Sequence, residues 1–68
     1  MDEISKKLGQ NIKRIREQKG MTQGDICRSL NLDRGYISSI ESGKRNPTLS
    51  TLKKLADALK ISVDELLK

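Results

Sequence analysis

The feature of this sequence that most restricts its fold is the spacing of its aliphatic residues, which recur three and four positions apart. The strongest pattern lies in residues 49–59, where one helical face would carry Leu49, Leu52, Leu55, Ala56 and Leu59. Residues 4–19 carry a second stripe of this kind, made of Ile4, Leu8, Ile12 and Ile15. Because no segment shows the alternation of apolar and polar residues that is typical of a strand, the sequence predicts an all-α fold.

Capping residues predict three further helices, over about residues 23–30, 34–41 and 63–67. Their expected N-caps are Thr22, Asp33 and Ser62. Gly20 is expected to end the first helix in a left-handed conformation. A chain of 68 residues buries only about 60% of the surface of its unfolded form, which is too little for two cores. We therefore expect residues 1–68 to form one compact five-helix domain.

The charged residues indicate an anionic partner. The chain has 14 Lys and Arg against 9 Asp and Glu, a net charge of +5, which favours nucleic acid first and an anionic membrane surface second. With no histidine and Cys27 as the only cysteine, no intrachain disulfide and no zinc site of Cys and His residues can form. Because a glycine-rich phosphate loop is also absent, the sequence predicts neither an enzyme nor a bound metal or cofactor.

The opening residues lack the apolar segment of a signal peptide. No apolar run approaches the roughly 20 residues that a membrane span needs. These two features predict a soluble cytoplasmic protein.

The second and third predicted helices are joined by a tight turn, which is the geometry of a helix-turn-helix. On the third helix, Gly35 and Ser39 would point away from the core, flanked by Tyr36 and Ser38. Such a small, polar face lets a helix approach another surface closely. Arg34, at the N-terminal end of this helix, could bond O6 and N7 of a guanine in the major groove.

Three ordered motifs carry a family resemblance. They are Ile12-x-x-x-Arg16-x-x-x-Gly20-Met21-Thr22-Gln23, Tyr36-Ile37-Ser38-Ser39-Ile40-Glu41-Ser42-Gly43-Lys44-Arg45-Asn46-Pro47-Thr48-Leu49, and Leu52-x-x-Leu55-Ala56-x-x-Leu59 followed by Asp64-Glu65-Leu66-Leu67. From about Leu8 to Leu67 the chain resembles the phage repressor and Cro type of helix-turn-helix domain. Residues 33–38 are also similar to the recognition helix of restriction-modification controller proteins. The resemblance implies a compact lambda-repressor-like fold and a transcriptional regulator, with residues 34–41 in the major groove of a near-palindromic operator in double-stranded DNA.

The same resemblance implies a set of DNA-contacting residues. Its base-reading positions fall on Arg34, Gly35 and Ser39. Contacts to the DNA backbone are expected from Gln23, Tyr36, Ser38, Lys44, Arg45 and Asn46. Gln23 would bond a phosphate or support the recognition helix. The chain departs from the family pattern at Gly24, Cys27 and Gly35, the last of which stands where a side chain usually reads a base.

Arg16 and Glu41 are expected to form a structural salt bridge. Each lies at the edge of an apolar stripe, so each should be partly buried, and neither charge can be left unpaired without a large cost. The resemblance implies the same bridge between the first helix and the end of the recognition helix.

The last predicted helix carries more apolar surface than a small core can take. Leu66 and Leu67 point about 100° apart, so one of them needs a partner outside the core. We expect Leu66 in the core, with Ile61 and Leu67 anchoring a homodimer.

Two other functions remain open. An interaction module of the same fold, such as an antitoxin or a partner-binding repressor head, would dock protein instead of DNA. Alternatively, the first helix would lie on a membrane surface through its basic residues Lys6, Lys7, Lys13, Arg14 and Lys19.

Overall fold

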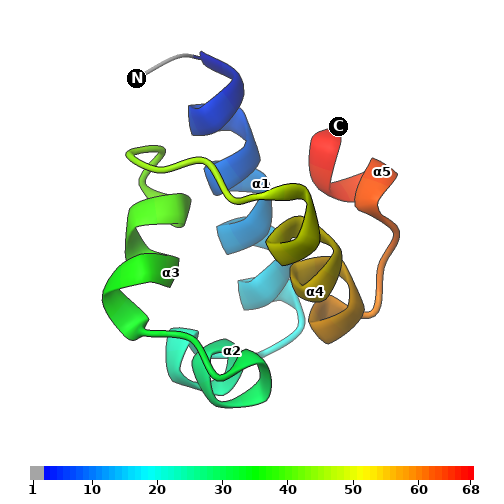
Figure 1. The fold of residues 1–68 in the computed structure, drawn as a ribbon. Helices are drawn as coiled ribbons and strands as arrows, with labels where there is room; N and C mark the ends of the chain where they lie inside the picture. The colour runs from blue at the N-terminus through cyan, green and yellow to red at the C-terminus, as the bar shows by residue number, and fades with distance from the viewer. Residues whose placement is uncertain (1–2) are drawn as a thin grey trace.

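The computed structural model describes residues 3–68, so the first two residues of the expected domain lie outside the described range. It contains α1 (Glu3–Gln18), α2 (Gln23–Leu30), α3 (Arg34–Glu41), α4 (Leu49–Leu59) and α5 (Val63–Leu67), and no strand within residues 3–68. The predicted all-α fold is confirmed. Figure 1 shows α3 on one side of α1 and α4 and α5 on the other, with the α3–α4 loop crossing in front of α1.

The start of α2 is fixed by a reciprocal pair of hydrogen bonds. The Thr22 hydroxyl accepts from the N–H of Asp25, and the Asp25 carboxylate accepts from the N–H of Thr22. This capping box satisfies two of the N–H groups that a helix leaves free at its first turn. Asp33 stands at the N-cap of α3, but its carboxylate makes no capping bond. Its backbone carbonyl accepts from the N–H groups of Tyr36 and Ile37.

All five helices contribute to one apolar core. Its buried members are Leu8, Ile12, Ile15, Ile26, Cys27, Ile37, Ile40, Leu52, Leu55, Ala56, Leu59 and Leu66. The two helical stripes found in the sequence supply seven of these twelve residues. Cys27 packs among them as a small apolar side chain.

Two residues expected in the apolar stripes are exposed. Ile4 is 77% exposed and Leu49 is 80% exposed, so their placement in the stripes' buried faces was wrong. Both lie at the first turn of a helix. Figure 1 shows the first turn of α1 projecting past its neighbours, and spacing alone does not reveal where a neighbouring helix stops covering a stripe.

None of the helices described here has both the length and the apolar composition that crossing a bilayer requires.

Candidate nucleic-acid interface

α3 has one face in the core and one in solvent. Ile37 and Ile40 are 1% exposed and anchor the helix, which contacts both α1 and α2. On the opposite side Arg34, Gly35 and Ser38 are exposed, and Ser39 is half-buried. The outer face therefore contributes no large side chain to the core and is free to meet a partner.

Ser39 is already engaged within its own helix. Its hydroxyl donates a hydrogen bond of 2.8 Å to the carbonyl oxygen of Gly35, one turn earlier. The side chain thus lies along α3 and does not project from its outer face.

Arg16 and Glu41 are brought together by the structure. Arg16 Nε donates to Glu41 Oε2 at 2.7 Å, and Arg16 Nη2 donates to Glu41 Oε1 at 3.1 Å. Both residues are buried, and Arg16 Nη1 also donates to the carbonyl oxygen of Met21 at 2.7 Å. The hydrogen bond that Arg16 donates to Glu41 raises the pKa of Arg16 above its ordinary value, although burial acts in the opposite direction. This bidentate ion pair, together with the bond to Met21, connects α1, the α1–α2 turn and the end of α3.

Gln23 joins the same network. Its Nε2 donates to Glu41 Oε1 at 3.0 Å, so the first residue of α2 contacts the last residue of α3. Of the two roles expected for Gln23, this contact is the one that supports α3. No buried side-chain nitrogen or oxygen in residues 3–68 lacks a hydrogen-bond partner, so this polar cluster is fully satisfied.

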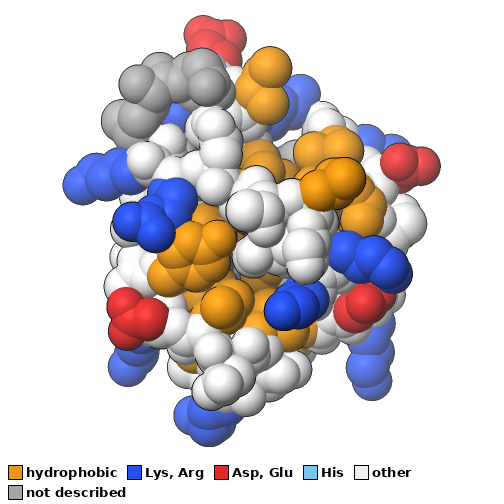
Figure 2. All heavy atoms as spheres, viewed as in Figure 1, with side chains coloured by type: hydrophobic (Ala, Val, Ile, Leu, Met, Phe, Trp, Pro, Cys, Tyr) orange, Lys and Arg blue, Asp and Glu red, His pale blue; other side chains and the backbone are white. Residues whose placement is uncertain are grey.

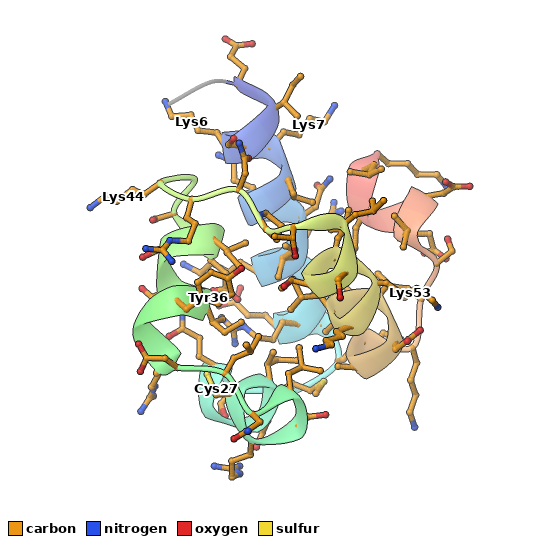
Figure 3. The ribbon with its side chains drawn as sticks, viewed as in Figure 1. Lys6, Lys7, Cys27, Tyr36, Lys44 and Lys53 are labelled. Carbon is orange, nitrogen blue, oxygen red and sulfur yellow. The ribbon has the colours of Figure 1, made fainter. Side chains whose placement is uncertain are left out.

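The α3–α4 loop carries the remaining polar candidates. Lys44, Arg45 and Asn46 are all exposed. The guanidinium of Arg45 lies over the ring of half-buried Tyr36, 5.1 Å from its centroid. Figure 3 shows Lys44 extending away from the body of the molecule. A cation stacked on a ring that packs against the core keeps less freedom than an ordinary surface arginine.

The carboxyl of Asp25 lies at the first turn of α2. Its hydrogen bonds from the backbone and then the side chain of Thr22 hold the pKa of the carboxyl below its ordinary value. Arg28 pairs with the same carboxylate on the surface of α2. This charge at the first turn also suits the positive end of the helix dipole.

Three polar or small residues of α1 were missed by the sequence analysis. Ser5 donates to the side-chain oxygen of Asn46, Gly9 lies against the end of α3, and Asn11 Nδ2 donates to the carbonyl oxygen of Leu66 at 2.9 Å. A signal existed for the first two, since Ser5, Gly9, Ile12 and Arg16 follow one another at helical spacing and form a single row. That row is buried along its whole length and includes Arg16 of the ion pair.

The C-terminal leucines face in different directions. Leu66 is fully buried, Leu67 is 53% exposed, and Ile61 is half-buried. Leu67 lines a shallow groove together with Ile4, Lys7 and Leu8 of α1. Figure 2 shows apolar side chains exposed on the part of the surface where α4 and α5 lie.

Neither the loop nor α3 carries a cluster suited to a metal ion: within residues 3–68 no three His, Cys, Asp or Glu side chains lie together.

Comparison with known proteins identifies relatives along nearly the whole chain. Residues 12–66 match the family model described as helix-turn-helix. An HTH-type transcriptional regulator from Sinorhizobium fredii is 42% identical over 64 residues, which cover 94% of this chain and 83% of that protein. The immunity repressor of Bacillus phage phi105 is 45% identical over 56 residues, but the match spans 82% of this chain and only 39% of that longer protein.

The solved structures include a similar protein bound to DNA. The restriction-modification controller protein C.Esp1396I, as a tetramer in complex with its natural 35-base-pair operator, superposes with a TM-score of 0.83 and 38% identity. The superposition covers 100% of this chain and 100% of that one.

Proposed function

The chain belongs to the helix-turn-helix family, and from this premise we propose that it is a sequence-specific transcriptional regulator that binds duplex DNA. α3 enters the major groove of a near-palindromic operator. The observation that carries the proposal is the low, polar outer face of α3, held by a buried ion pair and two buried isoleucines.

Base recognition begins at the N-terminal end of α3. The major groove is about 12 Å wide and admits one helix, whose first residues meet the base edges. Arg34 is exposed at this end and can donate two parallel hydrogen bonds to O6 and N7 of a guanine. Gly35 and Ser39 add no bulk, so the backbone of α3 comes close to the next base pairs.

Contacts to the DNA backbone set the position of α3 in the groove. Lys44, Arg45 and Asn46 bind phosphates on one side, with Arg45 already oriented by Tyr36. Tyr36 and Ser38 flank the outer face and contribute contacts to the same backbone. On the other side, Gln23 offers its second amide hydrogen to a phosphate while the first remains on Glu41.

Two copies of the chain act together. One recognition helix covers about one half-site, whereas a homodimer places two helices roughly 34 Å apart on one face of the duplex. Leu67 and Ile61 anchor this isologous contact, since Leu67 stays exposed beside an apolar groove. The relative bound to its operator is a tetramer, which accords with assembly on DNA. Such a regulator needs no metal or cofactor, is no enzyme, and works in the cytoplasm.

Selection from a pool of random duplex DNA tests the proposal. Repeated binding and amplification should enrich a near-palindrome with a guanine at equivalent places in its two halves. The Arg34→Ala variant, selected in parallel, should lose the preference for that guanine alone. If the wild-type chain enriches no sequence, the proposal is wrong. Salt separates the two functions, because binding to duplex DNA should fall by orders of magnitude between about 50 and 200 mM salt, whereas docking to a protein through an apolar interface would hardly change.

A further inference from the structure

The α3–α4 loop is built against the first turns of α1. Gly43 has a φ of 82°, and a Cβ at this position would lie 3.0 Å from both Cα and Cγ of Lys6. The loop backbone therefore rests directly on Lys6. Only a residue without a side chain fits between the two segments in this left-handed conformation.

A second contact joins the same two segments. Ser5 is 5% exposed, and its hydroxyl donates to the side-chain oxygen of Asn46. One turn further along α1, Gly9 lies against the carbonyl oxygens of Ile40 and Glu41 at the end of α3. The start of α1, the end of α3 and the loop are thus held together at three successive places.

This arrangement puts a further cation beside the loop. Lys6 is exposed, and no ion pair to its amino group occurs within residues 3–68. Figure 3 shows Lys6 and Lys44 extending toward the same side of the molecule, while Lys7 extends toward the other. Figure 2 shows basic side chains gathered at this edge, where α1 begins and the loop lies.

We propose that Lys6 binds a DNA phosphate and extends the phosphate-binding surface of the loop onto α1. This inference rests on the proposed function. Phosphates of one strand follow each other about every 3.4 Å along the duplex axis, so a strand held by Lys44 and Arg45 passes further phosphates beside the segment that touches the loop. The flexible stem of Lys6 lets its amino group meet the nearest of these.

Binding at Lys6 gives α1 two points of attachment to the complex. Arg16 holds the C-terminal part of α1 to α3 through Glu41, and Lys6 holds its beginning to the DNA. Lys6 reads no base, so its contribution is uniform across sequences and depends on salt.

The test compares the salt dependence of operator binding for the wild type, Lys6→Gln and Lys53→Gln. Lys53 is the matched control because it is an exposed lysine on α4, which Figure 3 places on the opposite side of the molecule. Each protein is titrated with the duplex selected by the wild type between about 50 and 200 mM salt. Lys6→Gln should flatten the slope of log affinity against log salt by about 0.9. The ratio of wild-type affinity to Lys6→Gln affinity should therefore fall about 3.5-fold between about 50 and 200 mM salt.

Two control variants and a second selection separate failure of this inference from failure of the proposed function. Lys53→Gln and Lys6→Arg should both retain the wild-type slope, and selection with Lys6→Gln should return the wild-type consensus. A wild-type slope for Lys6→Gln would overturn this inference and leave the proposed function intact. An equal change in Lys53→Gln would also overturn it, because the effect would then follow net charge alone. If the wild type selected no sequence, the proposed function itself would fail first. Thermal unfolding of each variant checks that it is folded.

Discussion

Gly9 of α1 and Ile40 of α3 lie so close that a Cβ on Gly9 would stand 2.3 Å from the carbonyl oxygen of Ile40. Because that oxygen belongs to the helix backbone, it cannot move away as a flexible side chain could. We expect Gly9→Ala to destabilise the fold by about 1 to 3 kcal/mol, although alanine is the better helix former by about 1 kcal/mol. Urea denaturation of the two proteins measures the difference.

Gly24→Ala is the matched control for this substitution. Gly24 lies in the first turn of α2, and a Cβ there would meet the Arg28 side chain at 3.4 Å, an ordinary contact. Here the helix propensity of alanine should decide the outcome and raise stability by up to about 1 kcal/mol. Equal effects at Gly9 and Gly24 would contradict the close approach of α1 and α3.

Removal of one partner of the buried ion pair should cost about 3 kcal/mol or more, because the other charge is left without its counterpart. Arg16→Met strands the Glu41 carboxylate in a site where both residues are 7% exposed. The double variant Arg16→Met with Glu41→Leu should recover much of the loss, since it leaves no buried charge. Chemical denaturation of the single and double variants completes the cycle, and wild-type stability of Arg16→Met would refute the assignment.

Asp25 makes stability depend on pH at the acid end. Because its pKa is lowered in the folded chain, its contribution is fully present above the unfolded value of about 3.9 and is lost as pH falls through the lower folded value. The urea midpoint of Asp25→Asn should therefore lie below that of the wild type at about pH 7, with the gap closing near pH 2. A gap that stays constant down to the lowest pH would show that the charge of Asp25 is not responsible.

Arg34 and Lys44 should differ in the kind of binding they lose. Arg34→Ala should cost about 1 to 3 kcal/mol on the selected operator and relax the preference at one base pair. Lys44→Ala should weaken binding to all sequences alike and flatten the salt slope by about one. Titrations with the operator and with single-base variants separate the two patterns. Loss of base preference in Lys44→Ala would reverse the assigned roles.

Leu67→Lys should convert a dimer to a monomer, because it places a charge in the proposed apolar contact. Leu49→Lys is the control, since Leu49 is 80% exposed and lies outside the groove that Leu67 lines. Sedimentation at micromolar concentration reports the assembly of each. A Leu67→Lys variant that sediments like the wild type would remove Leu67 from the interface.

The helices and most of the core could be predicted from the sequence, because apolar spacing and capping residues are local signals. α2 to α5 have the expected bounds, and α1 is displaced by one residue. The failures at Ile4 and Leu49 have one cause. Periodicity identifies the apolar face of a helix, but coverage of that face depends on where other helices end.

The contacts of the candidate site also fall into those that the sequence predicted and those that depend on packing. Arg16 and Glu41 could be paired in advance because each lay beside an apolar stripe and carried an opposite charge. The contacts of Ser5 with Asn46 and of Gly9 with Ile40 join segments more than 30 positions apart by uncharged groups. Because these groups carry no opposite charges that would suggest a pair in the sequence, only the folded chain reveals their contacts. Gln23 was placed correctly at the start of α2, but its bond to Glu41 needed the packing of α2 on α3.

The division of α3 into a buried and an exposed face has a consequence for the history of such a protein. Ile37 and Ile40 carry the attachment to the core, whereas Arg34, Gly35 and Ser38 are exposed. Mutations on the exposed face can therefore alter the preferred DNA sequence with little effect on folding. A duplicated copy of the gene could drift toward a different operator while the scaffold stays under unchanged selection. Sequence divergence among regulators with this fold should concentrate at the few exposed positions of α3.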